Sequence, residues 1–238
     1  MRLIVGMQPV REAIAAHGEK LGRVLVAKDG GPKVDALSRF ARDRGAKVET
    51  VERRELDSIA RGAYHQNVIA YAPELAFVEA ADLVVLDKPI VLALDEIEDP
   101  QNFGAIVRSA VALGAAAVMW PEHHSAPLTP ATFRASAGAI EHARLCRVSS
   151  LPSALAELKA AGFAIVGLDA NGDADLSTMA LRAPLVLVVG AEGKGLRKPV
   201  KGACDALARL PMRGPVASLN ASVAAAVALY EVTRATGA

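Results

Sequence analysis

The stretch that organises this chain reads Leu210-Pro211-Met212-Arg213-Gly214-Pro215-Val216-Ala217-Ser218-Leu219-Asn220-Ala221-Ser222. An apolar strand is predicted to stop at Pro211, and Gly214 and Pro215 then form a turn. Ser218 is a typical N-cap, so we expect a helix to begin directly behind it. The loop would bring small polar side chains and backbone N–H groups to a helix N-terminus, which favours a polar ligand. An ordinary capped helix has the same pattern.

A glycine-rich loop lies upstream, at Val188-Val189-Gly190-Ala191-Glu192-Gly193-Lys194-Gly195. It follows an apolar strand, and its glycines would allow close backbone approach to a ligand or a positive φ. The spacing matches neither the dinucleotide fingerprint G-x-G-x-x-G nor the Walker phosphate loop, because no Ser or Thr follows the Gly-Lys pair. Glu192 is either an acid at a helix start or a functional carboxylate.

The third stretch reads Asp95-Glu96-Ile97-Glu98-Asp99-Pro100-Gln101-Asn102-Phe103-Gly104-Ala105-Ile106-Val107-Arg108. It predicts a strand end, an acidic loop and a helix that Asn102 caps. Gly104 lies one turn before Arg108, and a helical side chain leans back over the preceding turn. Arg108 would then reach across a place that Gly104 leaves bare, which suits an arginine that binds a phosphate or a ribose. A surface salt bridge from Arg108 to Glu98 or Asp99 is the other interpretation.

The three stretches belong to a segment, 90–238, in which strands alternate with helices. Predicted strands cover 90–94, 115–120, 164–168 and 185–189, and predicted helices cover 103–113, 154–161 and 221–233. Apolar strands that alternate with helices indicate an α/β fold with a parallel sheet covered on both faces. Ligands gather at the carboxyl ends of such strands, so we expect the three stretches to meet there.

Residues 1–75 are predicted to form a smaller α/β domain, and 76–89, which lack periodicity, a connection between the domains. The smaller domain ends with the polar segment Arg61-Gly62-Ala63-Tyr64-His65-Gln66-Asn67 and a strand at 68–72. This polar segment carries one aromatic side chain. It is able to contact RNA bases by stacking and hydrogen bonding, although a plain loop before a strand would look the same.

Composition narrows the class of protein without naming a partner. Apolar residues make up 52% of the 238 residues, enough for two modest domains, and the net charge of +1 is no signature of a nucleic-acid binder. Cys146 and Cys204 stand apart, so we expect no disulfide framework. His123 and His124 lack the further ligands of a metal site. We expect no signal peptide and no membrane span, and hence a cytoplasmic protein.

Together the motifs resemble those of a known family. The patterns Asp99-Pro100-x-Asn102-x-Gly104-x-x-x-Arg108, Gly190-x-Glu192-x-x-Gly195 and Pro211-Met212-x-Gly214-x-x-x-Ser218-Leu219-Asn220-x-Ser222 are similar, in order and spacing, to the three motifs of the SpoU (TrmH-type) 2′-O-ribose RNA methyltransferases of the SPOUT superfamily. The segment 136–142 and the region around His65 and Gln66 also resemble this family. Asn67 departs from it, because relatives commonly carry Gly there, and so does Ala221, where Val is usual.

The resemblance implies an L30e-like N-terminal substrate-binding domain and a C-terminal SPOUT domain with a deep trefoil knot. It implies S-adenosylmethionine as cofactor and matches four residues to the positions that bind it: Gly190, Leu210, Ser218 and Leu219. It ties four others to activity: Asn102, Arg108, Glu192 and Asn220. Arginine essentially never loses its proton, so we expect Arg108 to stabilise the developing alkoxide rather than to act as the base.

The resemblance is to the branch that methylates a guanosine ribose in 23S ribosomal RNA. Three alternatives stay open. They are a tRNA ribose 2′-O-methyltransferase of the same family, a branch that methylates ribosomal RNA for antibiotic resistance, and an RNA-binding ribosome assembly factor without activity. The last predicted helix is nearly all Ala and Val, so its face must be covered, either within the subunit or by a second copy. The family implies a homodimer with sites built from both subunits.

Overall fold

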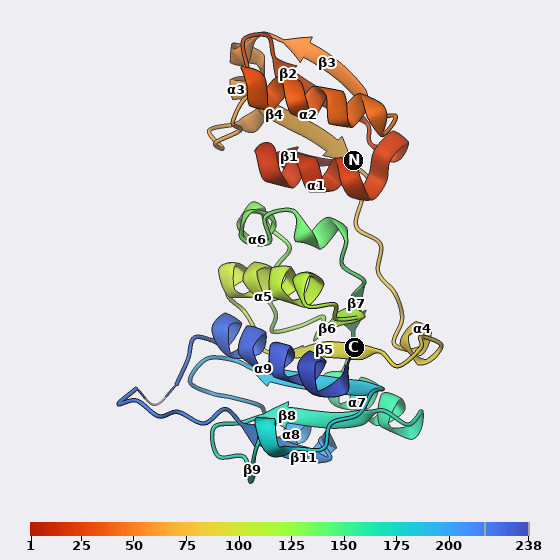
Figure 1. Ribbon diagram of the computed structural model, residues 1–238, viewed down its shortest axis with the longest axis vertical. Helices are drawn as coiled ribbons and strands as arrows, with labels where there is room; N and C mark the ends of the chain where they lie inside the picture. Colours follow the sequence, from red (N-terminus) through yellow and green to blue (C-terminus); the bar gives the residue numbers. More distant parts are fainter. Residues whose placement is uncertain (217, 238) are drawn as a thin grey trace. The chain divides into compact units, whose positions relative to one another are not determined.

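The computed structural model describes residues 1–216 and 218–237, so Ala217 of the opening stretch lies outside the described residues. The chain divides into two compact units (Figure 1). The first holds residues 1–75 together with 137–142. The second holds residues 76–136 and the rest of the described chain from 143 onward.

The first unit is a mixed sheet with helices on both faces. In the described chain its strands are β1 (Arg2–Val5), β2 (Arg23–Ala27), β3 (Lys47–Val51) and β4 (Val68–Ala72), in the order β1-β4-β2-β3. Helices α1 (Met7–His17) and α2 (Pro32–Asp43) cover one face, and α3 (Arg53–Ala60) covers the other. The turn η1 (Gly18–Lys20) joins α1 to β2. Successive strand residues point to opposite faces, so Val24 packs toward α1 and α2 whereas Leu25 packs toward α3.

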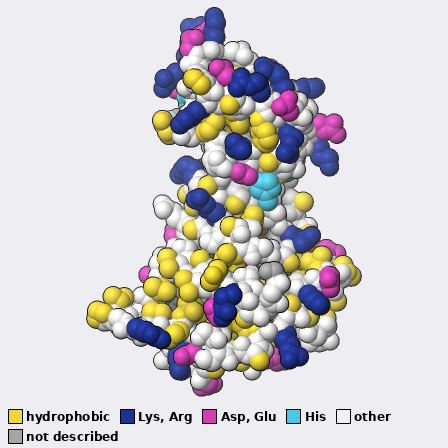
Figure 2. Space-filling view, viewed as in Figure 1, with side chains coloured by type: hydrophobic (Ala, Val, Ile, Leu, Met, Phe, Trp, Pro, Cys, Tyr) yellow, Lys and Arg dark blue, Asp and Glu magenta, His cyan; other side chains and the backbone are white. Residues whose placement is uncertain are grey.

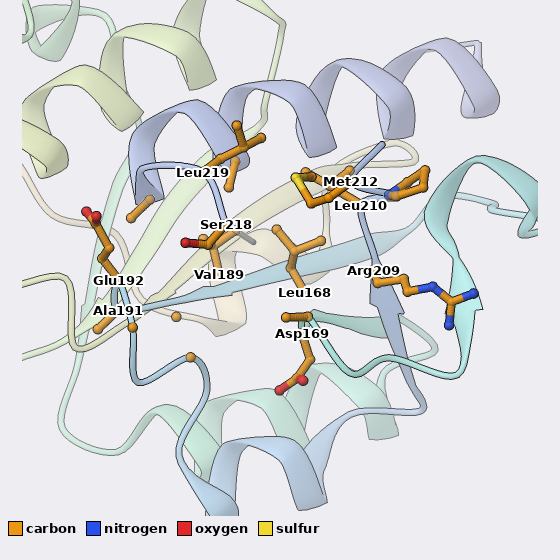
Figure 3. Close-up of a pocket in the computed structure, with 17 residues that line it drawn as sticks. Leu168, Asp169, Val189, Ala191, Glu192, Arg209, Leu210, Met212, Ser218 and Leu219 are labelled. Atoms are coloured by element: carbon orange, nitrogen blue, oxygen red, sulfur yellow. The ribbon is translucent and has the colours of Figure 1, made fainter. Parts of the chain in front are cut away.

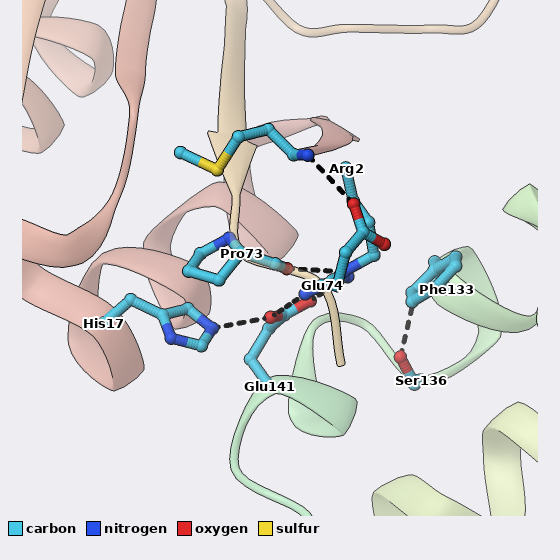
Figure 4. A network of polar contacts seen from close by, with 8 residues as sticks. Arg2, His17, Pro73, Glu74, Phe133, Ser136 and Glu141 are labelled. Atoms are coloured by element: carbon cyan, nitrogen blue, oxygen red, sulfur yellow. Dashed lines mark hydrogen bonds and ion pairs between the residues drawn. The ribbon is translucent and has the colours of Figure 1, made fainter. Parts of the chain in front are cut away.

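A short turn, η2 (Ala139–Glu141), completes the first unit. The Glu141 carboxylate accepts two hydrogen bonds from Arg2, at 3.0 and 2.8 Å, and lies 2.8 Å from Nε2 of His17 (Figure 4). The Glu141 side chain is only 2% exposed, and Arg2 also donates to the carbonyl of Pro73 at 2.8 Å. Removing one partner of a buried ion pair leaves an uncompensated charge, so this network fixes η2 to β1 and α1.

The second unit is built on a parallel sheet, as predicted. Within the described residues its order is β7-β6-β5-β10-β8-β11-β9. The strands are β5 (Ile90–Asp95), β6 (Ala117–Pro121), β7 (Leu145–Val148), β8 (Ala164–Leu168), β9 (Ala174–Asp175), β10 (Leu185–Gly190) and β11 (Ala206–Arg209). Strand β10 inserts between β5 and β8, so the spatial order departs from the chain order. The trefoil knot implied by the resemblance concerns these connections and stays a prediction.

Helices cover both faces of the large sheet. On one face α4 (Ala81–Val84), α7 (Leu151–Ala160) and α8 (Lys198–Ala203) pack against alternate strand residues such as Met119. The next residue, Trp120, points to the other face and meets Phe103 of α5 (Pro100–Ala112) edge to face, with 5.0 Å between ring centroids. Helix α5 packs against α6 (Pro130–Ala135) and α9 (Ala221–Thr236), and α9 contacts the turn η3 (Leu176–Thr178).

The segment 76–89, predicted to connect the domains, lies within the second unit. The Val78 N–H donates to the carbonyl of Leu145 at 2.8 Å, beside β7. Leu83 of α4 is fully buried in the core under the large sheet. A helix of four residues and a single strand pairing are too short to show a periodic pattern, so the sequence alone does not predict that this segment packs on the second unit.

Candidate functional site

The carboxyl ends of four neighbouring strands bring the three sequence stretches together, as predicted. Gly190 at the end of β10 pairs with Asp95 at the end of β5, and Val189 pairs with Leu168 at the end of β8. On the other side of β8, Ala208 of β11 lies opposite Leu168. The loops that follow these four strands therefore leave the sheet side by side.

A cavity of about 350 Å³ opens among these loops (Figure 3). All four residues predicted to bind the cofactor line it: Gly190, Leu210, Ser218 and Leu219. Leu168, Val189 and Met212 add apolar walls, and Asp169 places a carboxylate among the lining residues. An apolar cavity of this size with a few polar groups is typical of a small-molecule site. Ala221, the departure from the usual Val, also lines it.

The glycine loop is folded back on itself beside this cavity. The Gly195 N–H donates to the carbonyl of Ala191 at 2.9 Å, and a Cβ on Gly190 would overlap the backbone of Gly195. Gly195 itself has φ +65°, in the left-handed region that side chains rarely adopt. The glycines are therefore required by the loop's own tight backbone, which forms one wall of the cavity.

Three polar side chains, one from each stretch, form a hydrogen-bonded set. The Asn220 amide Nδ2 donates to Oδ1 of Asn102 at 3.0 Å and to Oε2 of Glu192 at 3.2 Å. On its other side, Asn220 Oδ1 accepts from the backbone N–H and the hydroxyl of Ser222, at 2.9 and 2.6 Å. The donors of Ser222 fix which way the amide points, because only its oxygen is able to accept from them. Three of the four residues predicted to take part in catalysis thus meet.

Two predicted helix caps are wrong. Asp99, not Asn102, caps α5, because its carboxylate accepts from the N–H groups of Gln101 and Asn102 at 3.3 and 3.0 Å. Asn220, not Ser218, caps α9. Asn102 is thereby left free to bind Asn220, and Ser218 is left facing the cavity.

The prediction for Gly104 is also wrong. A Cβ at Gly104 would lie 2.5 Å from the Thr132 carbonyl oxygen and 2.6 Å from Cβ of Ala135, so the missing side chain makes room for α6 rather than for a ligand. Arg108, one turn later, is exposed and does not line the cavity. Among the residues that the structure describes, Arg108 has no ion pair, so the salt bridge to Glu98 or Asp99 is not formed either.

Comparisons with known proteins agree with this geometry. The model of the SpoU rRNA Methylase family matches residues 89–230. The chain belongs to this family. A second family model, described as RNA 2′-O ribose methyltransferase substrate binding, matches residues 3–78. The SpoU match spans all three motifs, and the protein is accordingly a member of the RNA 2′-O-ribose methyltransferases.

Individual relatives extend over nearly the whole chain. The YacO protein of Bacillus subtilis strain 168, named for the TrmH family of tRNA/rRNA methyltransferases, is 42% identical over 237 residues, which cover 97% of this chain and 94% of that protein. The SpoU methyltransferase AviRb from Streptomyces viridochromogenes, in complex with AdoMet, has a TM-score of 0.76 at 26% identity and covers 98% of this chain and 89% of its own. An AdoMet-bound rRNA methyltransferase from Sinorhizobium meliloti has the same TM-score and identity and covers 98% and 86%.

The cavity of this SpoU protein fits a ligand with the chemistry of S-adenosylmethionine. Such a molecule joins a flat adenine, a ribose and a charged amino-acid end. Leu168, Val189 and Leu210 provide apolar walls for a ring, and the folded glycine loop brings backbone groups to the same wall. The Asp169 carboxylate, 8% exposed, is suited to a hydroxyl or an ammonium group.

Sequence inspection missed an ion pair, between buried Asp95 and half-buried Arg197, that holds one end of the glycine loop. Asp95 is fully buried, and its carboxylate accepts from the Arg197 backbone N–H at 2.8 Å and from the guanidinium at 2.7 Å. This contact raises the pKa of Arg197. One signal was present in the sequence, since Asp95 is the single charged residue at the end of an otherwise apolar strand. Nothing local points to its partner, which lies beyond the loop.

A second missed pair lies at the cavity. The Asp169 carboxylate is 2.5 Å from Nζ of Lys201 and also accepts from the Asn171 N–H at 2.9 Å. The hydrogen bond from Lys201 lowers the pKa of Asp169 from its ordinary 3.8, against the opposing effect of burial. Asp169 is therefore ionised at neutral pH, with its charge held at one wall of the cavity.

The remaining candidates have no place in this site. His123 and His124 are exposed, and no group of three or more metal-ligating side chains occurs in the described part of the chain. Both cysteines are free, as predicted, and Cys146 is fully buried. Of the helices formed by residues 1–216 and 218–237, none has the length and apolar content needed to cross a membrane.

Proposed function

We propose that this protein transfers a methyl group from S-adenosylmethionine to the ribose 2′-hydroxyl of a guanosine in 23S ribosomal RNA. The observation that carries the proposal is the hydrogen-bonded set of Asn102, Glu192 and Asn220 beside a cavity of matching size. AdoMet in two structural neighbours supports the cofactor, and the substrate-binding match over residues 3–78 supports the RNA. The reaction would take place in the cytoplasm, where its RNA would be found.

The chain has two tasks in this reaction. S-adenosylmethionine supplies a methyl group on a positively charged sulfur, which is already a good electrophile. A ribose hydroxyl is a weak nucleophile, and its proton leaves as the oxygen–methyl bond forms and the sulfur–methyl bond breaks. The protein must therefore align the oxygen with the methyl group and stabilise negative charge on that oxygen.

We assign these tasks to the four motif residues. Asn220 is a positioning residue, because its amide nitrogen donates to both Asn102 and Glu192 while Ser222 fixes its direction. Asn102 then orients the ribose. Glu192 holds the Asn220 amide through one oxygen. Arg108 supplies positive charge near the developing alkoxide. Because it is exposed on α5 outside the cavity lining, we propose that a second copy of the chain brings it there.

The surface of α9 supports such a homodimer. Val223, Val227 and Tyr230 are 47%, 46% and 57% exposed, and their spacing places them on one stripe of the helix. Figure 2 shows apolar side chains gathered on this face of the second unit, over α9. A stripe of this kind pairs well with itself across a two-fold axis.

Light scattering tests the dimer. We expect a dimer at micromolar concentration, and we expect Val227→Asp to give a monomer because it places a charge in the stripe. Val85→Asp is the matched control, since Val85 is 85% exposed in the same unit and away from α9. A monomeric unchanged protein, or equal effects of both substitutions, would contradict the assignment.

The activity is tested by transfer of a tritiated methyl group to total RNA, followed by mapping of ribose methylation. We expect label in 23S ribosomal RNA, at a guanosine, and label in tRNA or none at all would overturn the proposal. Single-turnover rates of Arg108→Ala and Arg108→Lys then test the proposed role of the guanidinium. Lysine keeps the charge and loses the planar fork, so we expect it to recover part of the rate.

A further inference from the structure

The first unit carries a second cavity, of about 420 Å³, that the methyl-transfer site does not use. It is formed by the loop 61–67 between α3 and β4, which we call the Tyr64 loop. Its lining residues are Arg53, Asp57, Gly62, Ala63, Tyr64, His65, Gln66 and Asn67. Tyr64 is 83% exposed, although an aromatic ring of this size is usually buried.

Hydrogen bonds of the residues next to Tyr64 fix the conformation of its loop. His65 is 5% exposed, and its Nδ1 accepts from the Asn67 backbone N–H at 3.0 Å. That contact requires an unprotonated Nδ1, so Nε2 carries the proton and donates to Asp57 at 2.9 Å. The Gln66 side-chain oxygen accepts from the Met7 N–H at 2.9 Å. The ring of Tyr64 therefore stands on a loop whose neighbouring residues are all fixed.

The backbone of the loop supports the same conclusion. Arg61, Gln66 and Asn67 have φ values of +47°, +51° and +66°, although none is glycine. Such conformations persist where surrounding contacts enforce them, and they gather at binding sites. Asn tolerates the left-handed region better than most other side chains, so Asn67 suits a position where relatives commonly carry glycine.

Three kinds of group meet at this cavity, and together they match a nucleotide. The Tyr64 ring offers an exposed face on which a base could stack. The exposed Arg53 guanidinium suits a phosphate, and it lines the cavity. The Gln66 oxygen accepts from the Met7 N–H, so its N–H₂ group is the part of the amide able to donate to a base edge. Bases inside a duplex are stacked and out of reach, so the nucleotide must be unpaired.

We propose that the Tyr64 loop binds an unpaired nucleotide of the RNA substrate, with the base stacked on Tyr64 and its phosphate toward Arg53. The inference rests on the proposed function only in that the ligand is RNA. It adds a recognition site in the first unit, where the family description names substrate binding without saying which residues perform it.

The test measures binding of a fluorescein-labelled single-stranded RNA of about 12 nucleotides to the full-length protein by fluorescence anisotropy. We expect Tyr64→Ala to raise the Kd roughly 5- to 100-fold, because loss of one stacked base has an effect of this size. Tyr64→Phe keeps the ring and should stay within about twofold of the unchanged protein. Arg53→Ala should lower the salt dependence of log Kd by about 0.7, the value for one lost phosphate contact.

Two controls separate the loop from general charge and from folding. Arg39→Ala removes an exposed arginine from α2, on the opposite face of the small sheet, and should leave single-strand binding nearly unchanged. The same RNA annealed as a duplex should bind the unchanged protein and Tyr64→Ala alike. Thermal melting should not change for Tyr64→Ala, because the side chain is exposed.

Equal binding by Tyr64→Ala and the unchanged protein would overturn the inference and leave a protein partner as the occupant of the loop. No measurable binding of the single strand by the unchanged protein would overturn it as well. The readout does not require methyl transfer. If Tyr64→Ala weakens binding but the protein methylates an RNA other than 23S, only the proposed function is refuted. If 23S ribosomal RNA is methylated normally and Tyr64→Ala binds the single strand as tightly as the unchanged protein, only the role of the Tyr64 loop is refuted.

Discussion

Replacement of Asn220 separates its structural task from its chemical one. The side chain caps α9 through its oxygen, which accepts twice from Ser222, and it joins Asn102 to Glu192 through its nitrogen. Asn220→Ala removes both functions. Asn220→Ser keeps an oxygen able to cap the helix, because Ser and Asn are about equal at this position. Serine is too short to reach both Asn102 and Glu192.

The stability cost of Asn220→Ala follows from the cap. Loss of an N-cap side chain costs about 1 kcal/mol, and the solvent-exposed contacts to Asn102 and Glu192 add about 0.5 kcal/mol. For a chain of this size that total lowers Tm by about 3–6 °C. Asn220→Ser should lower Tm by no more than about 1–2 °C, because it keeps the cap.

The rate should not follow the stability. If Asn220 positions Asn102 and Glu192 through its nitrogen, both variants lose that contact and the single-turnover rate of methyl transfer falls on the order of 100-fold in each. Cofactor affinity, measured by calorimetry, should stay within a few-fold, because Asn220 does not line the cavity. A serine variant with the unchanged rate would refute the reasoning, since it would show that Asn220 acts only as a helix cap.

Three further predictions rest on single contacts. Gly190→Ala should abolish cofactor binding and lower the free energy of unfolding by a few kcal/mol, because the added Cβ would overlap the backbone of Gly195. The control is Gly202→Ala in α8, whose added Cβ meets nothing within 4 Å and which should stabilise the protein by about 0.5 kcal/mol. Calorimetry measures cofactor binding by the two variants, and thermal melting measures their stability. The pKa of Asp169 is lowered in the folded state, so its contribution to stability is present above pH 3.8 and is lost as the pH falls through the folded pKa. Lys201→Met removes the cause of this shift, so the free energy of unfolding, measured against pH, should fall less steeply in acid for this variant. Burial raises the pKa of Cys146 to about 11, so at pH 8 about one thiol in a thousand is ionised and a thiol reagent should modify it only after unfolding; rapid modification of the native protein would contradict this burial.

The pattern of apolar residues predicts the layout of the second unit because it has a simple physical cause. Strands such as β5 and β10 lie between two layers of helices, so every residue from 90 to 94 and from 185 to 189 is buried and apolar. A parallel sheet then places the following loops at one edge. The meeting of the three stretches follows from this geometry, and the structure confirms it.

The capping residues are harder to predict, because several good candidates stand within a few positions of each other. Asp99 and Asn102 precede α5, and Ser218 and Asn220 precede α9. Capping preferences barely separate these residue types. The choice is made by tertiary contacts, since Asn102 is needed by Asn220 and Ser218 faces the cavity. Local sequence carries no record of such contacts.

Ion pairs between residues far apart in the chain also cannot be predicted from local sequence patterns. Asp95 and Arg197 are separated by 102 positions in the chain, yet their contact ties the C-terminal end of the glycine loop to the end of β5. Arg197 is 36% exposed, but its loss would leave the fully buried Asp95 carboxylate without its ionic partner. The loop thus depends as much on this pair as on the glycines, although only the glycines form a visible motif.

Gly104 and Arg108 belong to one sequence motif but have different roles, one in packing and one at the surface. Gly104 is required by the close approach of α6, so its position in the motif reports packing within the subunit. Arg108, one turn away, is exposed and has no ion pair among the described residues, so packing gives no reason for an arginine there. Under the proposed function, the reason lies in a molecule that binds at this surface. A second copy joined through the apolar stripe of α9, a helix that packs on α5, is the partner that would turn an exposed arginine into part of an active site.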